Sequence, residues 1–524
     1  MADVPRSGRR SRLRPGSLRR RPGEARRRPG EARRQPGEAR RRPGGARLPR
    51  SFEPLRHRGF RLLAGGQLAS NLGDSCYAVA LPWYVLAHRG GALLLAGVLA
   101  AYGIPRSALV AVGGHASDRF RPWTVMMVAD VSRAVAVGLL AATSASGPAR
   151  ASLLVPIAVV LGAGEGMFLP GSFSIVPALL PGEELQAGNA LTSGGTQLAT
   201  LVGPGIGGAI VAIAGPWPAF LVDAASFVVS AVTLAGVRVA QQPAGGAGEA
   251  GAAGEAGEAG AAGEAGAAAA PLAGTGALSA AGALPSPGPA GALPSPGSAG
   301  ALPPGSAGAP PRGSGTTLRQ LFRTERVLQL AVLVTLAANL GSGGVGEVAL
   351  PALAHGPFHA GAGGYGAMIA AFGAGALVGT ILAGQAPRFR RPAVVGALVL
   401  LGDAVFMAIV PYLGGAVPAG VMLACFGSLN GFGNVLMITV VQRWAPPELL
   451  GRLMGVFLLA SFGIFPVSVL LGGIVVRYLG PAAFFPMAAG VLGAAILVGI
   501  SQQSWRDFGA EPAPGASAET SLTG

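Results

Sequence analysis

Long apolar runs dominate this chain and leave few ways in which it can fold. We predict twelve such segments of about 20 residues, the length at which a helix crosses the hydrocarbon core of a bilayer. The expected spans are 62–86, 93–113, 123–143, 152–176, 190–213, 219–237, 328–352, 364–384, 392–411, 416–440, 452–474 and 481–501. Charged residues make up only 12% of the chain, against roughly 25% in soluble domains. The sequence therefore predicts an all-α membrane protein.

The first six segments and the last six are copies of one pattern. Matching residues lie 265 positions apart: Pro181 and Pro446, Glu183 and Glu448, Gly207-Gly208 and Gly472-Gly473, Gly215-Pro216 and Gly480-Pro481, and Phe220 and Phe485. An Asn-Leu-Gly step also begins at both Asn71 and Asn339. Membrane proteins made of two such repeats commonly bind a substrate between them. We therefore expect two six-helix bundles, 55–237 and 319–503, and a transporter.

Three stretches outside the bundles have a different composition. Residues 1–50 carry 18 arginines in Pro-Gly-Glu-Ala repeats and supply +14 of the net charge of +16. We expect them to form a disordered arm, which is either a tether to anionic lipid or nucleic acid or a low-complexity extension without a role. Residues 238–318, rich in Ala, Gly and Pro, predict a flexible linker, and residues 504–524 a tail.

The distribution of arginine predicts the orientation in the membrane. Beyond residue 50, most arginines outside the apolar segments fall on the side of the N-terminus, and Arg89, Arg150 and Arg477 fall on the other side. Because basic loops stay in the cytoplasm, both termini, the linker and the tail should be cytoplasmic. The absence of lysine and the abundance of Ala, Gly and Arg indicate a bacterial cell-membrane protein.

The turn expected between the second and third segments carries Gly114, Asp118, Arg119 and Arg121. Glycine there lets two helices approach closely, and the acid can pair with arginine or face a helix N-terminus, so the turn can latch one conformation. It resembles the Gly-x-x-x-Asp-Arg-x-x-Arg signature of the major facilitator superfamily, with Arg121 one place early. The resemblance implies twelve transmembrane helices in two six-helix repeats. The alternative is a basic loop that only sets the topology.

The fifth segment contains Gly203, Pro204, Gly207 and Gly208. Small residues allow tight helix contacts, and the proline removes a backbone hydrogen bond, so this helix can bend. The pattern is similar to the Gly-Pro-x-x-Gly-Gly motif of antiporters in the superfamily, which implies export. A glycine-rich helix contact without further role is the alternative.

Gln67, Asn71 and Asp74 share one face of the first segment because they are spaced four and three apart. An ionisable group inside a membrane helix costs at least about 2.5 kcal/mol, so Asp74 should face the bundle interior. The pattern resembles the drug:proton antiporter-3 branch, which includes siderophore and macrolide exporters. We expect Asp74 to bind substrate or proton, with Glu347 near the matching position of the second half. A structural hydrogen bond is the competing interpretation.

Further acids lie inside the predicted helices. Asp130 and Arg133 are three apart and can pair, with Arg106 as a third member, in a network that is either structural or involved in gating. Glu165 stands among Gly162, Gly164 and Gly166, which allow close approach to its carboxyl, and is a candidate proton carrier; otherwise it lies near the external mouth without a role. The fourth segment lacks the Arg-x-x-x-Gln-Gly pattern of many proton antiporters, so proton coupling is implied by resemblance alone.

Together these features predict a secondary transporter that exports an amphipathic small molecule, such as a drug, siderophore or secondary metabolite, by alternating access in exchange for protons. We expect a monomer in the lipid bilayer, without enzymatic activity, cofactor, metal site or nucleic-acid partner. An uptake permease or lipid flippase of the same fold remains an alternative. A non-transporting membrane scaffold or sensor, with the arginine-rich arm as its working part, is another.

Overall fold

A computed structural model describes residues 50–119, 122–145, 147, 150–237, 322–386, 389–445 and 447–509. These residues form helices joined by short turns, and none of them lies in a strand. The predicted arm except Arg50, the linker 238–318 and the tail beyond residue 509 lie outside the described residues.

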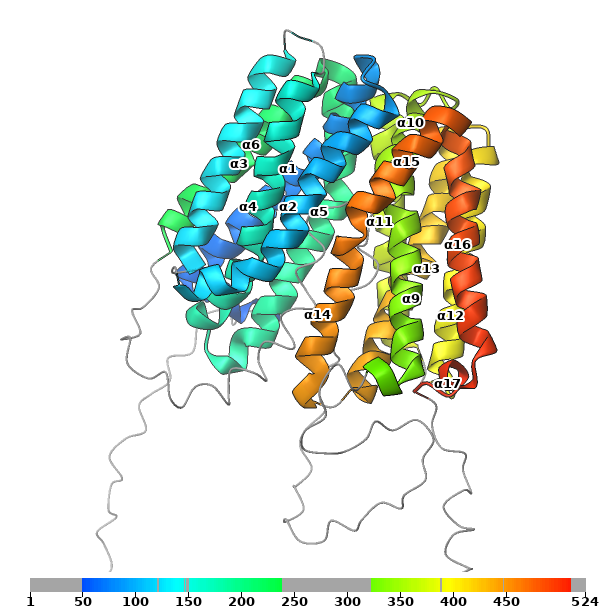
Figure 1. Ribbon diagram of the computed structural model, residues 1–524. Coiled ribbons are helices and arrows are strands. Elements are labelled where there is room, and N and C mark those ends of the chain that lie inside the picture. Colours follow the sequence, from blue (N-terminus) through cyan, green and yellow to red (C-terminus); the bar gives the residue numbers. More distant parts are fainter. Residues whose placement is uncertain are drawn as a thin grey trace, which may run out of the picture. The chain divides into compact units, whose positions relative to one another are not determined.

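Six long helices make up the first half (Figure 1). Their bounds are α1 Arg58–Ala87, α2 Gly91–Arg119, α3 Pro122–Ser144, α4 Ala151–Leu179, α5 Leu185–Ala214 and α6 Pro216–Ala235. Two short 3-10 turns, η1 Arg50–Arg56 and η2 Gly182–Glu184, precede α1 and α5.

The second half repeats this arrangement with more interruptions. Its elements are α9 Arg326–Gly344, η4 Val345–Ala349, α10 Leu350–His355, α11 Gly361–Gln385, α12 Pro392–Ile409, η5 Val410–Tyr412, α13 Ala416–Trp444, α14 Pro447–Gly463, α15 Phe465–Leu479, α16 Pro481–Ser501 and α17 Gln503–Arg506. The run from α9 through η4 to α10 matches α1, and α14 with α15 matches α5.

Eleven stretches of the described residues are long and apolar enough to cross a membrane. Their outward faces expose large apolar side chains such as Val135, Ile213 and Val417, as contact with lipid requires. The first predicted segment, within α1, is not among the eleven, because polar side chains such as Gln67 and Asp74 lower its hydropathy. α1 nevertheless has 30 residues and lies against α5 and α6 inside the first bundle. The polar face of α1 is therefore turned toward protein.

One predicted turn is wrong. α2 continues to Arg119, so Gly114, Asp118 and Arg119 lie in a helix rather than in a tight turn. Backbone hydrogen bonding extends a helix beyond its apolar run, and hydropathy marks only the part inside hydrocarbon. The predicted span 452–474 is interrupted at Ile464, between α14 and α15. Pro466, two residues later, has no N–H to continue the helix through this point.

The last two helices of each half are joined by the same Gly-Pro turn. Gly215 and Gly480 have φ of 80° and 85° with extended ψ, a conformation that is nearly restricted to glycine. Pro216 and Pro481 then begin α6 and α16, where a missing N–H costs nothing. The duplicated dipeptide therefore encodes a duplicated corner.

A one-residue difference between the halves has a structural counterpart. Asn339 follows Asn71 by 268 positions, but Val348 follows Val79 by 269, so the second half has one extra residue between them. η4 is a π-helical turn at this place, and such a turn accommodates one extra residue within a continuous helix. Glu347 lies within this turn.

The duplicated glycine pairs make equivalent contacts in the two halves. The first glycine of each pair packs on the first helix of its own half: a Cβ at Gly207 would lie 2.7 Å from the Cα of Cys76, and one at Gly472 would lie 2.9 Å from the Cα of Gly344. The second glycine packs on the opposite half. A Cβ at Gly208 would approach α11, and one at Gly473 would approach α2. The two halves are thus related by approximate twofold symmetry, and helix pairs α5–α11 and α2–α15 join them.

Candidate functional site

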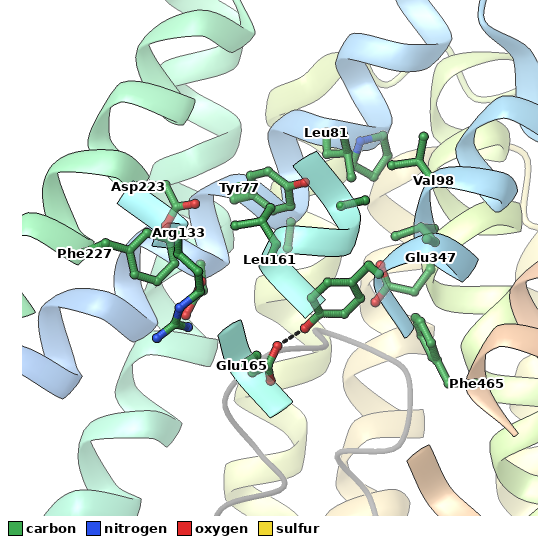
Figure 2. A pocket seen from close by; sticks show the side chains of 16 residues that line it. Tyr77, Leu81, Val98, Arg133, Leu161, Glu165, Asp223, Phe227, Glu347 and Phe465 are labelled. Atoms are coloured by element: carbon green, nitrogen blue, oxygen red, sulfur yellow. Dashed lines mark hydrogen bonds between the residues drawn. The ribbon is translucent and has the colours of Figure 1, made fainter. Parts of the chain in front are cut away.

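A cavity of about 60 Å³ lies at the junction of the two halves (Figure 2). Most of its wall comes from α1, α2, α4 and α6, whereas Glu347 of η4 and Phe465 of α15 approach from the second half. Figure 2 shows Asp223 and Arg133 on one side of this space and Glu347 and Phe465 on the other. Four carboxyl groups line the cavity, from Asp74, Glu165, Asp223 and Glu347.

Glu165 is held by two side chains of α2. It lies near the middle of α4, is 7% exposed, and forms an ion pair with Arg106, whose Nη2 lies 3.0 Å from Glu165 Oε1. The Tyr102 hydroxyl donates to Glu165 Oε2. Tyr102 and Arg106 are one turn apart on α2, so a single carboxylate fastens α2 to α4. Glu165 is thus inside the bundle and not at an external mouth.

The predicted close approach at Glu165 is confirmed. A Cβ at Gly166 would lie 2.7 Å from the backbone oxygen of Arg106, and one at Gly162 would collide with the backbone of Tyr102. A Cβ at Gly164 would lie 2.9 Å from Cγ of Arg133. The three glycines therefore bring α2 and the Arg133 side chain within reach of the carboxyl.

The predicted pairing of Asp130 with Arg133 on α3 is also present. Arg133 Nη2 lies 2.5 Å from Asp130 Oδ1, and Ser230 Oγ of α6 donates to Asp130 Oδ2 over 2.6 Å. The guanidinium lies over the rings of Phe168 and Phe227, 4.8 and 4.4 Å from their centroids. Burial between two aromatic faces and a carboxylate fixes this arginine in one position. Arg106 does not join this pair and binds Glu165 instead.

Asp74 and Asp223 complete the acidic wall. Neither forms an ion pair with an arginine in the described part of the chain. Asp223 is 1% exposed, and Gly73 allows it to approach α1, since a Cβ there would lie 2.7 Å from Asp223 Oδ1. Asp74 is half-buried and faces the cavity with Tyr77, one turn further along α1.

Arg106 also connects this cluster to the second half. Its guanidinium carbon lies 4.1 Å from the ring centroid of Phe462 in α14. The neighbouring Ser107 donates from Oγ to the backbone oxygen of Phe462 over 2.9 Å. The residue that holds Glu165 therefore touches the opposite bundle as well.

The other predicted site residues lie outside this cavity. Asn71 donates to Thr196 Oγ1 of α5 over 3.0 Å, and the matching Asn339 donates to Ser461 Oγ of α14 over 3.4 Å. The same bond in both halves is what a duplicated helix contact requires. Gln67 is buried in α1 away from the cavity lining.

Two motifs remain from the sequence. Within the helix-five motif, Gly203 and Gly207 pack on α1, and the backbone of Pro204 lies against Gly366 of α11. Of the predicted latch, Gly114, Asp118 and Arg119 occupy the last turns of α2, and Arg121 lies outside the described residues.

Sequence reasoning missed Tyr102 and gave Asp223 no role. Tyr102 precedes Arg106 by four positions in an otherwise apolar helix, a spacing that places both on one face and could have indicated a polar stripe. Asp223 was visible as an intramembrane acid, but its neighbours come from α1 and α3, far away in the sequence.

Comparison with known proteins agrees with this architecture. Residues 63–465 match the Major Facilitator Superfamily, which is most of the chain. The chain belongs to this superfamily. It is therefore a multi-pass membrane protein of the major facilitator fold, as the sequence predicted.

The relatives of this superfamily member include drug pumps. It is 28% identical over 184 residues to the multidrug efflux pump Tap of Mycolicibacterium fortuitum, a match that covers 34% of this chain and 45% of that protein. It is 30% identical over 186 residues to the multidrug efflux pump Tap of Mycobacterium tuberculosis strain H37Rv, covering 34% of this chain and 44% of that protein. The chain thus aligns with less than half the length of these relatives.

Proposed function

We propose that this transporter exports an amphipathic small molecule across the bacterial cell membrane and takes up protons in exchange. The observation that carries the proposal is the cavity between the halves, which has more carboxyls than arginines. Arg106 and Arg133 pair with Glu165 and Asp130, so Asp74 and Asp223 can bind or release a proton without breaking an ion pair. The similarity to proteins named multidrug efflux pumps supports the direction and the class of substrate.

The pairing of Glu165 suggests how proton binding is linked to movement. A proton on Glu165 removes the charge that holds Arg106, and Arg106 is also the residue that stacks on Phe462 of the other half. Weakening one contact changes the orientation of the arginine and hence the other contact. Protonation at this carboxyl thereby alters the junction between α2 and α14, which must open and close in alternating access.

Transport in membrane vesicles tests the proposal. Everted vesicles from a pump-deficient bacterial strain that expresses the full chain should accumulate members of a panel of amphiphilic drugs when a proton gradient is imposed. A protonophore should abolish the accumulation. The proposal is wrong if no compound of a broad panel moves, or if movement ignores the gradient. Accumulation only in right-side-out vesicles would indicate uptake instead of export.

The substitution Glu165→Gln separates coupling from folding. It should lower gradient-driven drug accumulation at least tenfold, because the amide cannot carry the proton, while exchange of drug for drug at equal pH persists. Glu183→Gln, the same change at an exposed position in η2, is the matched control and should leave both unchanged. If Glu165→Gln vesicles keep gradient-driven accumulation, Glu165 is not the coupling residue.

A further inference from the structure

A second cavity lies entirely within the second half. Its volume is about 130 Å³, roughly twice that of the cavity between the halves, and its walls come from α9, α11, α12, α13, α14 and α16. The transport mechanism proposed above does not use it.

Asp403 of α12 is the one acid that lines this second cavity, and it is 1% exposed. Neither of its carboxyl oxygens has a hydrogen-bond partner among the described residues, and no described arginine forms an ion pair with it. Asn434 of α13 lines the same cavity, and its Oδ1 is likewise a buried acceptor without a donor in the described part of the chain. Three buried acceptor atoms in this cavity thus have no donor among the described residues.

The symmetry of the fold shows that this cavity is the counterpart of the charged cluster. Gly427 and Gly431 of α13 pack on the backbone of Phe372 and Ala376. In the first half, Gly162 and Gly166 of α4 pack in the same way on the backbone of Tyr102 and Arg106. Tyr102 and Arg106 precede Phe372 and Ala376 by 270 positions. Asn430 follows Glu165 by 265 positions, as the glycines of α13 follow those of α4, and Asp403 follows Arg133 by 270 positions, as Phe372 follows Tyr102. In the first half Glu165 and Asp130 therefore pair with arginines, whereas Asp403 forms no ion pair with an arginine among the described residues.

The remaining wall is mostly apolar, and Thr335, Asn339, Ser342 and Asn430 are its other polar residues. The ring centroids of Phe372 and Phe426 lie 5.3 Å apart. Phe457, Met407 and Met437 add further apolar side chains to the lining. Ligand sites are typically of this kind, mostly apolar with a few polar groups that fix orientation. A primary ammonium carries three donor hydrogens and one positive charge, which match the two carboxylate oxygens of Asp403 and the Oδ1 of Asn434.

We propose that this cavity is a binding site for a monovalent organic cation, with the ammonium held by Asp403 and Asn434 and an apolar or aromatic body against the phenylalanines. Aromatic faces also attract cations, which adds to selectivity for charge. The assignment goes beyond the proposed export function and does not depend on the direction or the coupling of transport.

Binding of benzylamine to the purified full chain in lipid nanodiscs tests this assignment. Calorimetry at neutral pH, where benzylamine is a cation, should show stronger binding than for benzyl alcohol, its neutral analogue of similar shape. Asp403→Asn should weaken benzylamine binding at least tenfold and leave benzyl alcohol unaffected. Glu183→Gln, at an exposed position outside both cavities, should leave both affinities unchanged.

A second variant keeps the test decisive if Asp403→Asn does not fold. Ser342→Phe introduces a large ring into the cavity from α9 without changing charge, and it should abolish binding of both compounds. The assignment is overturned if the wild type binds the two compounds equally or binds neither. It is also overturned if Asp403→Asn binds benzylamine as the wild type does.

Discussion

At the scale of single residues, Arg106 is one of the side chains through which the two halves of the molecule are in contact. It is 2% exposed, pairs with Glu165 of its own half and stacks on Phe462 of the other half. A planar guanidinium can do both at once, because its edge donates hydrogen bonds while its face contacts a ring. Lysine has no such face, so these two contacts depend on arginine.

A double-mutant cycle measures this dual role. Arg106→Lys and Phe462→Leu should each lower the rate of drug transport, and the double variant should be little worse than either single one. The expected coupling between them is about 0.5–2 kcal/mol, the range of a cation–π contact. Transport rates in vesicles at matched expression provide the measurement. Fully additive effects would show that the contact has no part in transport.

At the scale of elements, the Gly-Pro-x-x-Gly-Gly stretch of α5 serves two interfaces at once. Gly203 and Gly207 face α1 within the first half, whereas Gly208 faces α11 of the second half. Glycines four apart lie on one side of a helix, and the next residue is turned by about 100° toward a neighbouring helix. The motif whose resemblance implied export therefore also brings α5 into close contact with the second bundle.

The substitution Gly208→Ala should disturb that interface. Its Cβ would lie 2.9 Å from the backbone oxygen of Ala362 and 3.0 Å from the Cα of Gly366, so the helices must separate. Overpacking of this kind costs about 1–3 kcal/mol. Gly205→Ala is the control in the same motif, because its Cβ would lie 4.0 Å from that of Ala370.

Thermal unfolding in detergent and drug transport provide the readouts. Gly208→Ala should lower the apparent Tm and the transport rate, and Gly205→Ala should change neither. Equal behaviour of the two variants would contradict the proposed close contact.

The π-helical turn η4 shows how one element can depart from its copy. The extra residue in the second half is absorbed there, and Glu347 within the turn lines the cavity. The residue that matches Asp74 in the second half is Ser342, which lines the second cavity instead. The acid contributed by this helix to the first cavity thus sits in the inserted turn, a common position for functional groups in π-bulges.

At the scale of the whole molecule, several contacts between the halves lie toward one end of the helices. Trp83 meets His355 with ring centroids 5.0 Å apart, near the ends of α1 and α10. A Cβ at Gly473 of α15 would lie 3.1 Å from the backbone oxygen of Ala92, close to the start of α2. With the termini in the cytoplasm, as arginine placement predicts, this is the external end. We propose that the structure represents a state closed to the outside.

Cross-linking at this end should stop the transport cycle. A Cβ at Gly363 of α11 would lie 3.7 Å from that of Ala212 of α5, within the range of disulfides. The double variant Ala212→Cys with Gly363→Cys is made in a Cys425→Ala background, which removes the exposed native thiol. This variant should lose transport on oxidation and regain it on reduction. Each single cysteine variant is the control and should be insensitive to oxidant. Undiminished transport by fully cross-linked protein would show that this end does not open.

Much of the architecture follows from the sequence alone. The length of the apolar runs is a local feature and predicts helices that cross a membrane. Matching residues 265 positions apart are found by aligning the chain with itself, and they predict two equivalent bundles. The pairing of Asp130 with Arg133 is likewise a matter of helical spacing and was correctly predicted.

Only the tertiary structure decided which charges meet across helices. Arg106 binds Glu165 and not Asp130, Asp223 approaches α1, and Asp403 has no cation beside it in the described part of the chain. These outcomes depend on the rotation of each helix about its axis and on neighbours that are distant in the sequence. A rotation of one residue, about 100°, would bring different side chains together, and the sequence pattern does not fix it that finely.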